Sequence, residues 1–111
     1  YKRQDTGDSS LEAFNTEISI DIETRELDSY KYEKIKLLKI DAEGHELEVL
    51  LGAKKTLSNI EYISVDMGAE KGEGTENTVA LVTNFLISQN FGLVDFKESR
   101  TTGLFKNLIY N

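Results

Sequence analysis

Three segments of the chain carry the hydrophobic pattern of β-strands. In Glu17–Glu23, three isoleucines alternate with acidic or polar residues, and this period of two predicts a strand with one buried face and an acidic outer face suited to a sheet edge. Ile35–Asp41 is apolar apart from two lysines, and it predicts a second, more buried strand that ends at the aspartate. Ile60–Met67 predicts a third strand.

Two other segments have helical spacing. The first helix is predicted from about His45 to Ser58. Its predicted inner stripe is Leu47, Leu50, Leu51 and Leu57, and its predicted water-facing residues are Glu46, Glu48, Lys54 and Lys55. The second helix is capped by Thr75 or Asn77 and runs to about Gln89. Its predicted inner stripe is Val79, Val82, Phe85 and Leu86.

The end of the chain predicts a hairpin. Gly92 follows the second helix, where a glycine can take a left-handed backbone. Leu93–Phe96 and Leu104–Tyr110 are then two short strands joined by a polar connection. Strands that alternate with helices imply parallel pairing, and the hairpin must add an antiparallel strand. The sequence therefore predicts an α/β fold with a mixed sheet and two helices.

Composition narrows the classes of function. The 111 residues suffice for one domain, and 13 basic against 20 acidic residues give a net charge of −7. Such a surface repels phosphate backbones and anionic lipid, so neither nucleic acid nor a membrane is expected as a partner. The chain has no cysteine, which excludes disulfides and favours a cytoplasmic location. Tyr1–Asn15 lacks the apolar stretch of a signal peptide.

The candidate chemistry lies where the second strand meets the first helix. Asp41 and Glu43 follow the carboxyl end of this strand, and ligands of open parallel sheets bind outside such ends. On spacing alone, Glu43 could equally complement a helix N-terminus while Gly44 lets the chain turn. His45 and Asp66 could converge with these acids, but their spacing matches no metal-ligand pattern, and no metal is predicted.

The residues around this junction resemble one known family. Leu37–Ala53 is similar to the "KIDVEG-x-E-x-x-VL-x-GA" signature of FkbM-family methyltransferases, with Ala42 in place of the usual valine. Gly7–Leu11 is similar to a small-residue segment of that family, and Glu26–Ser29 to its "LD" segment. Asn107–Tyr110 resembles its terminal strand. The resemblance covers most of the chain.

This resemblance implies an enzyme that transfers a methyl group from S-adenosylmethionine to a hydroxyl group. The acceptor would be a sugar or another small molecule. Asp41 would lie at the junction of cofactor and acceptor, as a catalytic and cofactor-binding residue, and Glu43 would contact the acceptor or act as base. His45 would be a surface residue of the first helical turn.

The same resemblance implies that part of the fold is missing. Family members begin with a strand and a "DVGAN-x-G" loop that cradles the cofactor, and no such loop occurs here. Gly68, Gly72 and Gly74 follow the third strand, too late and without a helix directly after them. Residues 1–111 are therefore interpreted as the C-terminal half of a Rossmann-like methyltransferase fold, inactive alone.

Two alternatives come from other classes of protein. A receiver-like phosphoacceptor domain would place its acceptor at Asp41 or Asp66. It also needs an acidic pair after its first strand, which is followed here by Glu23-Thr24-Arg25-Glu26 with no adjacent pair. A non-catalytic α/β interaction module derived from the methyltransferase half is the second alternative.

Overall fold

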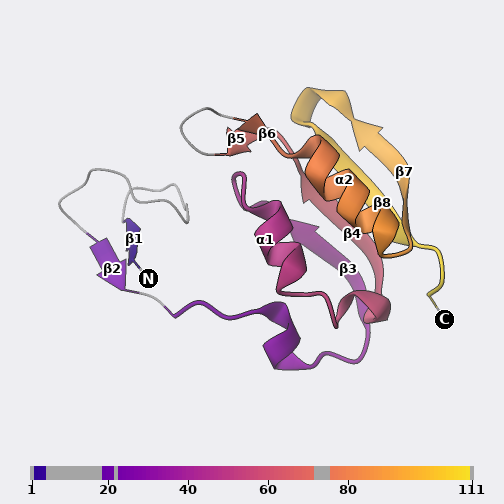
Figure 1. Cartoon of the computed structure of the whole chain (residues 1–111), viewed down its shortest axis with the longest axis horizontal. Helices are drawn as coiled ribbons and strands as arrows, with labels where there is room; N and C mark the ends of the chain where they lie inside the picture. Colours follow the sequence, from indigo (N-terminus) through magenta and orange to yellow (C-terminus); the bar gives the residue numbers. More distant parts are fainter. Residues whose placement is uncertain (1, 5–18, 22, 72–75, 111) are drawn as a thin grey trace.

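The protein is built around one mixed sheet covered by helices on one face (Figure 1). A computed structural model describes residues 2–4, 19–21, 23–71 and 76–110. The sheet has the strand order β3-β4-β8-β7. Its strands are β3 (Ile35–Ile40), β4 (Ile60–Asp66), β7 (Phe91–Lys97) and β8 (Thr102–Asn107). The helices are α1 (Glu46–Leu51) and α2 (Val79–Ser88).

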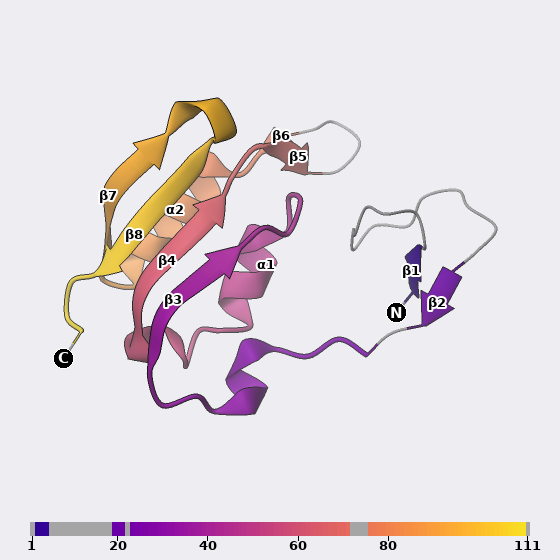
Figure 2. The same cartoon turned by 180° about the vertical axis from the view of Figure 1, so that it is seen from behind.

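The pairing of these strands confirms the predicted fold class. β3 and β4 are parallel, with α1 in the connection between them, whereas β8 pairs antiparallel with both β4 and β7. The predicted hairpin is formed by β7 and β8. Seen from behind, the sheet lies in front of both helices, so one face of the sheet carries neither helix (Figure 2). This face is called the open face below.

The hydrophobic core fills the space between the sheet and the helices. The sheet contributes Ile40, Ile63, Val65 and Phe105, which are buried with Leu50 of α1 and with Val82 and Leu86 of α2. At Gly103 a Cβ atom would lie 2.8 Å from the Met67 Cε and 2.9 Å from the Phe105 Cε1, so any other residue here would force these side chains to shift. The absence of a side chain at Gly103 leaves room for the side chains of Met67 and Phe105.

β3 is less buried than its sequence predicts. It pairs with β4 on one side, and no strand in the described part of the chain pairs with its other edge. Only Ile40 at its end is buried, and Leu37 is 53% exposed on the open face. In this strand the apolar residues of Ile35–Ile40 favour strand formation, but they are not buried on both faces of the sheet.

The first helix is shorter than the predicted span from His45 to Ser58. α1 ends at Leu51 and is followed by turns and a short 3-10 helix, η2 (Leu57–Asn59). Asp28, on the 3-10 helix η1 (Leu27–Tyr30), accepts hydrogen bonds from the amides of Lys55 and Thr56 and so stabilises the non-helical path. The predicted stripe is also wrong in part, because Leu51 is exposed, Leu47 is half-buried, and Glu46 is buried.

The second helix matches its prediction more closely. Val82 and Leu86 are buried, and Val79 and Phe85 pack against the core from the same helix. The cap is Thr78, one residue beyond the predicted Asn77, and Thr75 lies outside the described residues. The left-handed residue after the helix is Asn90, with φ of 70°, not Gly92, which lies in β7. After glycine, asparagine is among the residues that adopt this conformation most often.

Two small sheets lie outside the main one. β1 (Lys2–Gln4) pairs antiparallel with β2 (Ser19–Asp21), the described part of the strand predicted over Glu17–Glu23. β5 (Ala69–Lys71) pairs with β6 (Glu76–Asn77) where a loop was predicted. Among the described residues, no helix has the length and apolar character needed to cross a membrane.

Candidate functional site

The candidate site begins with the loop of residues 41–45, which links the carboxyl end of β3 to α1. Glu43 and Gly44 both have positive φ, at 48° and 102°. A left-handed backbone is unfavourable for a residue with a Cβ atom, so Glu43 is held there by its surroundings. This pair of residues reverses the chain within a few positions of Asp41, and the His45 amide closes the turn on the Ala42 carbonyl at 3.1 Å.

Glu46 holds this loop from inside the protein. Its side chain is only 1% exposed. One carboxylate oxygen, Oε2, accepts hydrogen bonds from the Gly44 amide at 2.8 Å and the Ala42 amide at 3.2 Å. The other, Oε1, accepts one from the Thr78 hydroxyl at 2.7 Å. Because Thr78 precedes α2, one buried carboxylate ties the loop to both helices, and the prediction that Glu46 faces water is wrong.

Asp41 lies in a pocket on the open face. The pocket, about 270 Å³, is lined by Lys39, Ile40, Asp41, Ser64, Asp66, Lys97, Arg100 and Thr102, and is called the carboxyl-end pocket. It lies at the carboxyl ends of the parallel strands β3 and β4. Ile40 and Val65 are paired and point into the core, so the alternating residues Lys39, Ser64 and Asp66 point to the opposite face. Asp41 and Asp66 are thus brought together.

The electrostatics of the pocket single out Asp66. Its pKa is raised above the ordinary value of a carboxyl group, first by burial and then by the negative charge of Asp41. Glu46 adds to this effect, while Arg100 and a hydrogen bond from the Gly68 amide oppose it. Sequence reasoning named Asp66 only as a metal or phosphate candidate. The signal for it was present, because Asp66 ends β4 as Asp41 follows β3.

The structure separates the other candidates from this pocket. Glu43 is half-buried in the loop and does not line the pocket. His45 does not line it either, and its Nδ1 lies 3.1 Å from the Glu48 carboxylate on the surface of α1. Of the residues that the structure describes, no three acidic, histidine or cysteine side chains are grouped to hold a metal ion.

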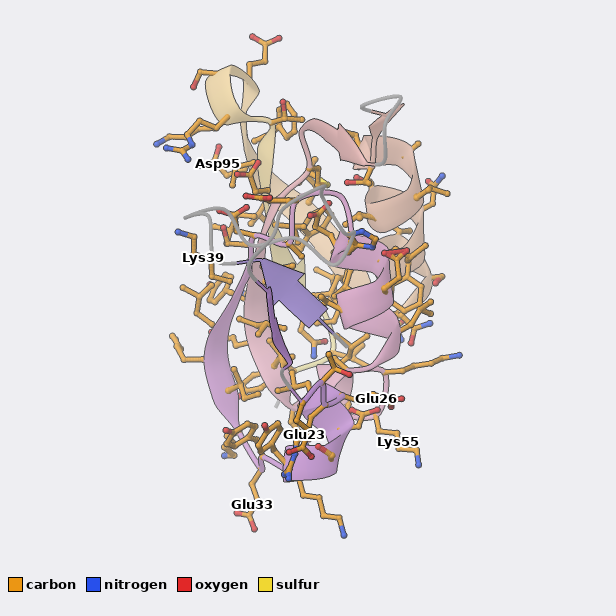
Figure 3. All side chains as sticks on the ribbon, turned by 90° about the vertical axis from the view of Figure 1, so that its left-hand side faces the viewer. Glu23, Glu26, Glu33, Lys39, Lys55 and Asp95 are labelled. Carbon is orange, nitrogen blue, oxygen red and sulfur yellow. The ribbon has the colours of Figure 1, made fainter. Side chains whose placement is uncertain are left out.

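Two larger hollows lie at the other end of the sheet. They measure about 800 and 540 Å³ and share Thr24, Arg25 and Glu26 in their walls. In Figure 3 the labelled side chains Glu26, Glu33 and Lys55 mark this end, away from Lys39 and Asp95. Asp28 is the carboxylate best held there, but its oxygens accept hydrogen bonds from the Lys55 amide and from the amide and hydroxyl of Thr56. The role of Asp28 is therefore structural. The volume of a hollow alone does not identify the functional site.

Comparison with known proteins adds one match. The family model described as "Methyltransferase FkbM domain" matches residues 2–98. The matched span includes β3, α1, β4, α2 and β7, and therefore most of the carboxyl-end pocket. Neither the curated proteins nor the solved structures contain a significant match to the chain.

Proposed function

The chain belongs to the FkbM methyltransferase domain family, and on that premise we propose that it takes part in transfer of a methyl group from S-adenosylmethionine to a hydroxyl group of a sugar or other small molecule. The observation that carries this proposal is the convergence of Asp41 and Asp66 in the carboxyl-end pocket. Such edges of parallel sheets are where α/β proteins bind their ligands. The family match argues against the receiver-like alternative.

The chemistry needs a group that removes the acceptor's proton. S-adenosylmethionine, when bound, supplies an electrophilic methyl group on a positively charged sulfur. Asp66 is the proposed base, because a carboxylate with a raised pKa accepts a proton more readily while it is still ionised. With the donor bound, the hydroxyl oxygen would bond to the methyl carbon as the carbon–sulfur bond breaks and S-adenosylhomocysteine leaves, and the hydroxyl proton would pass to Asp66.

Asp41 and Glu43 keep distinct proposed roles. Asp41 is exposed at the mouth of the pocket, and we assign it to the junction of cofactor and acceptor, where its charge complements the positive sulfur. Glu43 lies on the same loop but outside the pocket wall. Its proposed role is contact with the more distant part of the acceptor, not removal of the proton.

The described residues fit only part of the cofactor. The carboxylates of Asp41 and Asp66 suit its positive charge and its hydroxyl groups. The connection from β3 to α1 contains a single glycine, Gly44. In residues 23–71 and 76–110, no turn with several glycines leads directly from a strand into a helix of the kind that cradles a nucleotide. We therefore propose that the main cofactor-binding loop belongs to a segment other than these 111 residues.

Methyl-labelled S-adenosylmethionine tests this function. The protein that contains this domain is incubated with the labelled donor and a panel of sugars and hydroxylated small molecules, and products are separated by mass. Label in an O-methyl ether supports the proposal. Label on nitrogen or carbon would show a different acceptor atom, and transfer to no acceptor would favour the non-catalytic interaction module.

A further inference from the structure

We propose that the carboxyl-end pocket binds an anionic group of the acceptor, a carboxylate or a phosphate, through Lys97 and Arg100. The acceptor's hydroxyl group then lies toward Asp41 and Asp66. This inference deepens the proposed function and rests on it. It identifies the acceptor class as hydroxylated compounds with a negative charge a few bonds from the methylated oxygen.

The strand register places the pocket residues in rows. Asp66 of β4 is paired with Thr102 of β8, and Thr102 is paired in turn with Lys97 of β7. In the next row, Lys39 is paired with Ser64. Residues that are directly paired point to the same face of a sheet. The row Asp66–Thr102–Lys97 therefore forms a continuous polar floor across three neighbouring strands.

Opposite charges are sorted along this floor. Asp41 and Asp66 belong to the β3–β4 side, together with one basic residue, Lys39 of β3. The other two basic residues are at the far side, since Lys97 ends β7 and Arg100 lies on the 3-10 helix η3 (Glu98–Arg100) that joins β7 to β8. Neighbouring strands are about 4.8 Å apart, so the backbones of Asp66 and Lys97 are separated by about 10 Å. A small hydroxylated compound with one anionic group spans that distance.

The basic residues of the pocket are available to a ligand. Within the described part of the chain, the ion pairs join other residues, and neither Lys39, Lys97 nor Arg100 takes part in one. Arg100 is near enough to Asp66 to oppose the rise in its pKa, without an ion pair between them. An anion bound at this end would gain charge-assisted hydrogen bonds without breaking an existing one.

The overall charge makes this clustering informative. The chain has a net charge of −7, which repels anions from most of its surface. The pocket is lined by three basic and two acidic residues, a local excess of positive charge. An anion is therefore favoured in this pocket over other surfaces, and a neutral acceptor would leave Lys97 and Arg100 without a function in binding.

Anion titration of the 111-residue chain tests the inference directly. Sodium phosphate and, separately, sodium acetate are added to the ¹⁵N-labelled chain at constant ionic strength while backbone amide shifts are followed by NMR. The amides of Lys97, Arg100 and Thr102 should shift and saturate. Arg100→Gln should weaken the apparent Kd about fivefold or more, as loss of a charge-assisted contact implies.

Lys54→Gln is the matched control. It removes the same charge from an exposed residue outside the pocket, and the apparent Kd should stay within about twofold. Saturation by phosphate alone identifies a phosphorylated acceptor, and saturation by acetate as well includes carboxylates. No saturation below ~50 mM with either anion, or equal weakening by Arg100→Gln and Lys54→Gln, overturns the inference.

The titration needs no methyl donor, so it separates this inference from the proposed function. Anion binding at Lys97 and Arg100 in a protein that transfers no methyl group would leave the anion site standing and reject the function. Transfer of a methyl group to an uncharged acceptor, without anion binding, would reject the anion site alone.

Discussion

Glu46 is the residue on which the shape of the candidate site most depends. Its carboxylate is buried, and its hydrogen bonds reach the loop amides on one side and Thr78 on the other. A buried carboxylate needs hydrogen-bond donors such as these to be stable. The left-handed backbone at Glu43 and Gly44 lies inside the segment that they hold. Glu46 therefore positions the loop that carries Asp41 without lining the pocket itself.

Glu46→Gln should destabilise the protein by about 1–3 kcal/mol, because the amide can replace one acceptor oxygen but presents a donor to the loop amides. Denaturant unfolding measures this change. Hydrogen exchange at Gly44 should become faster, whereas in Thr78→Val the Gly44 amide keeps its acceptor and its protection.

Glu48→Gln is the control for this pair, since Glu48 lies on the same helix, carries the same charge and is exposed. It should leave Gly44 protection unchanged. Equal effects of Glu46→Gln and Glu48→Gln would mean that net charge, not the buried hydrogen bonds, governs the loop.

At the scale of elements, local periodicity predicted which segments form strands and helices, and it failed where distant residues decide. α2 was predicted well because the apolar residues on one side of this helix are the ones that pack against the sheet. α1 was predicted too long because Asp28, from another segment, holds the amides of Lys55 and Thr56. The exposure of β3 depends on strand order, and the burial of Glu46 depends on Thr78, so neither is visible in a local pattern.

The hydrogen bonds by which the Asp28 carboxylate joins η1 to η2 should contribute to stability in a pH-dependent way. Burial acts to raise its pKa, but hydrogen bonds from the Thr56 hydroxyl and from the amides of Lys55 and Thr56 outweigh it, and the pKa is lowered. A group whose folded pKa is depressed stabilises the fold above its unfolded pKa of about 3.9 and loses that contribution as pH falls through the folded value. Stability should therefore decline in acid below about pH 4.

Asp28→Asn should cost about 1–2 kcal/mol at pH 7, since the amide keeps one acceptor oxygen of the two. It should also reduce the loss of stability at acid pH, because the titrating carboxylate is gone. Thermal unfolding followed from about pH 7 down to about pH 2 measures this change. Glu33→Gln, an exposed neighbour in the same hollow, should change neither. If Asp28→Asn lost stability at acid pH as the wild type does, other carboxylates would be responsible for that loss.

On the scale of the whole molecule, the sequence identified the family correctly from the string Leu37–Ala53, and the family match supports it over residues 2–98. Asp41 was predicted as a site residue from its place after a strand, and in the structure it lines one pocket with Asp66. The pairing of Asp66 with Thr102 and Lys97 could not be read from the sequence, because register depends on the fold. At this scale too belongs the proposal that the main cofactor-binding loop lies in a segment other than these residues.

The isolated chain should therefore bind S-adenosylmethionine more weakly than ~1 mM, which corresponds to a binding free energy of only about −4 kcal/mol. Isothermal titration calorimetry with the 111-residue chain measures this affinity. Micromolar binding would contradict the expectation and would mean that these residues contain a complete cofactor site.

The central claim is that the pocket holding Asp41 and Asp66 is where methyl transfer takes place. The most direct measurement is the turnover number of Asp41→Asn in the protein that contains this domain, with unfolding followed in parallel. Because Asp41 is proposed to position cofactor and acceptor, we expect turnover to fall about 10²-fold or more with little loss of stability, and His45→Ala to stay within a few-fold of wild type. A fully active Asp41→Asn protein would contradict the claim, and so would a variant that unfolds, because Asp41 would then serve the fold and not the reaction.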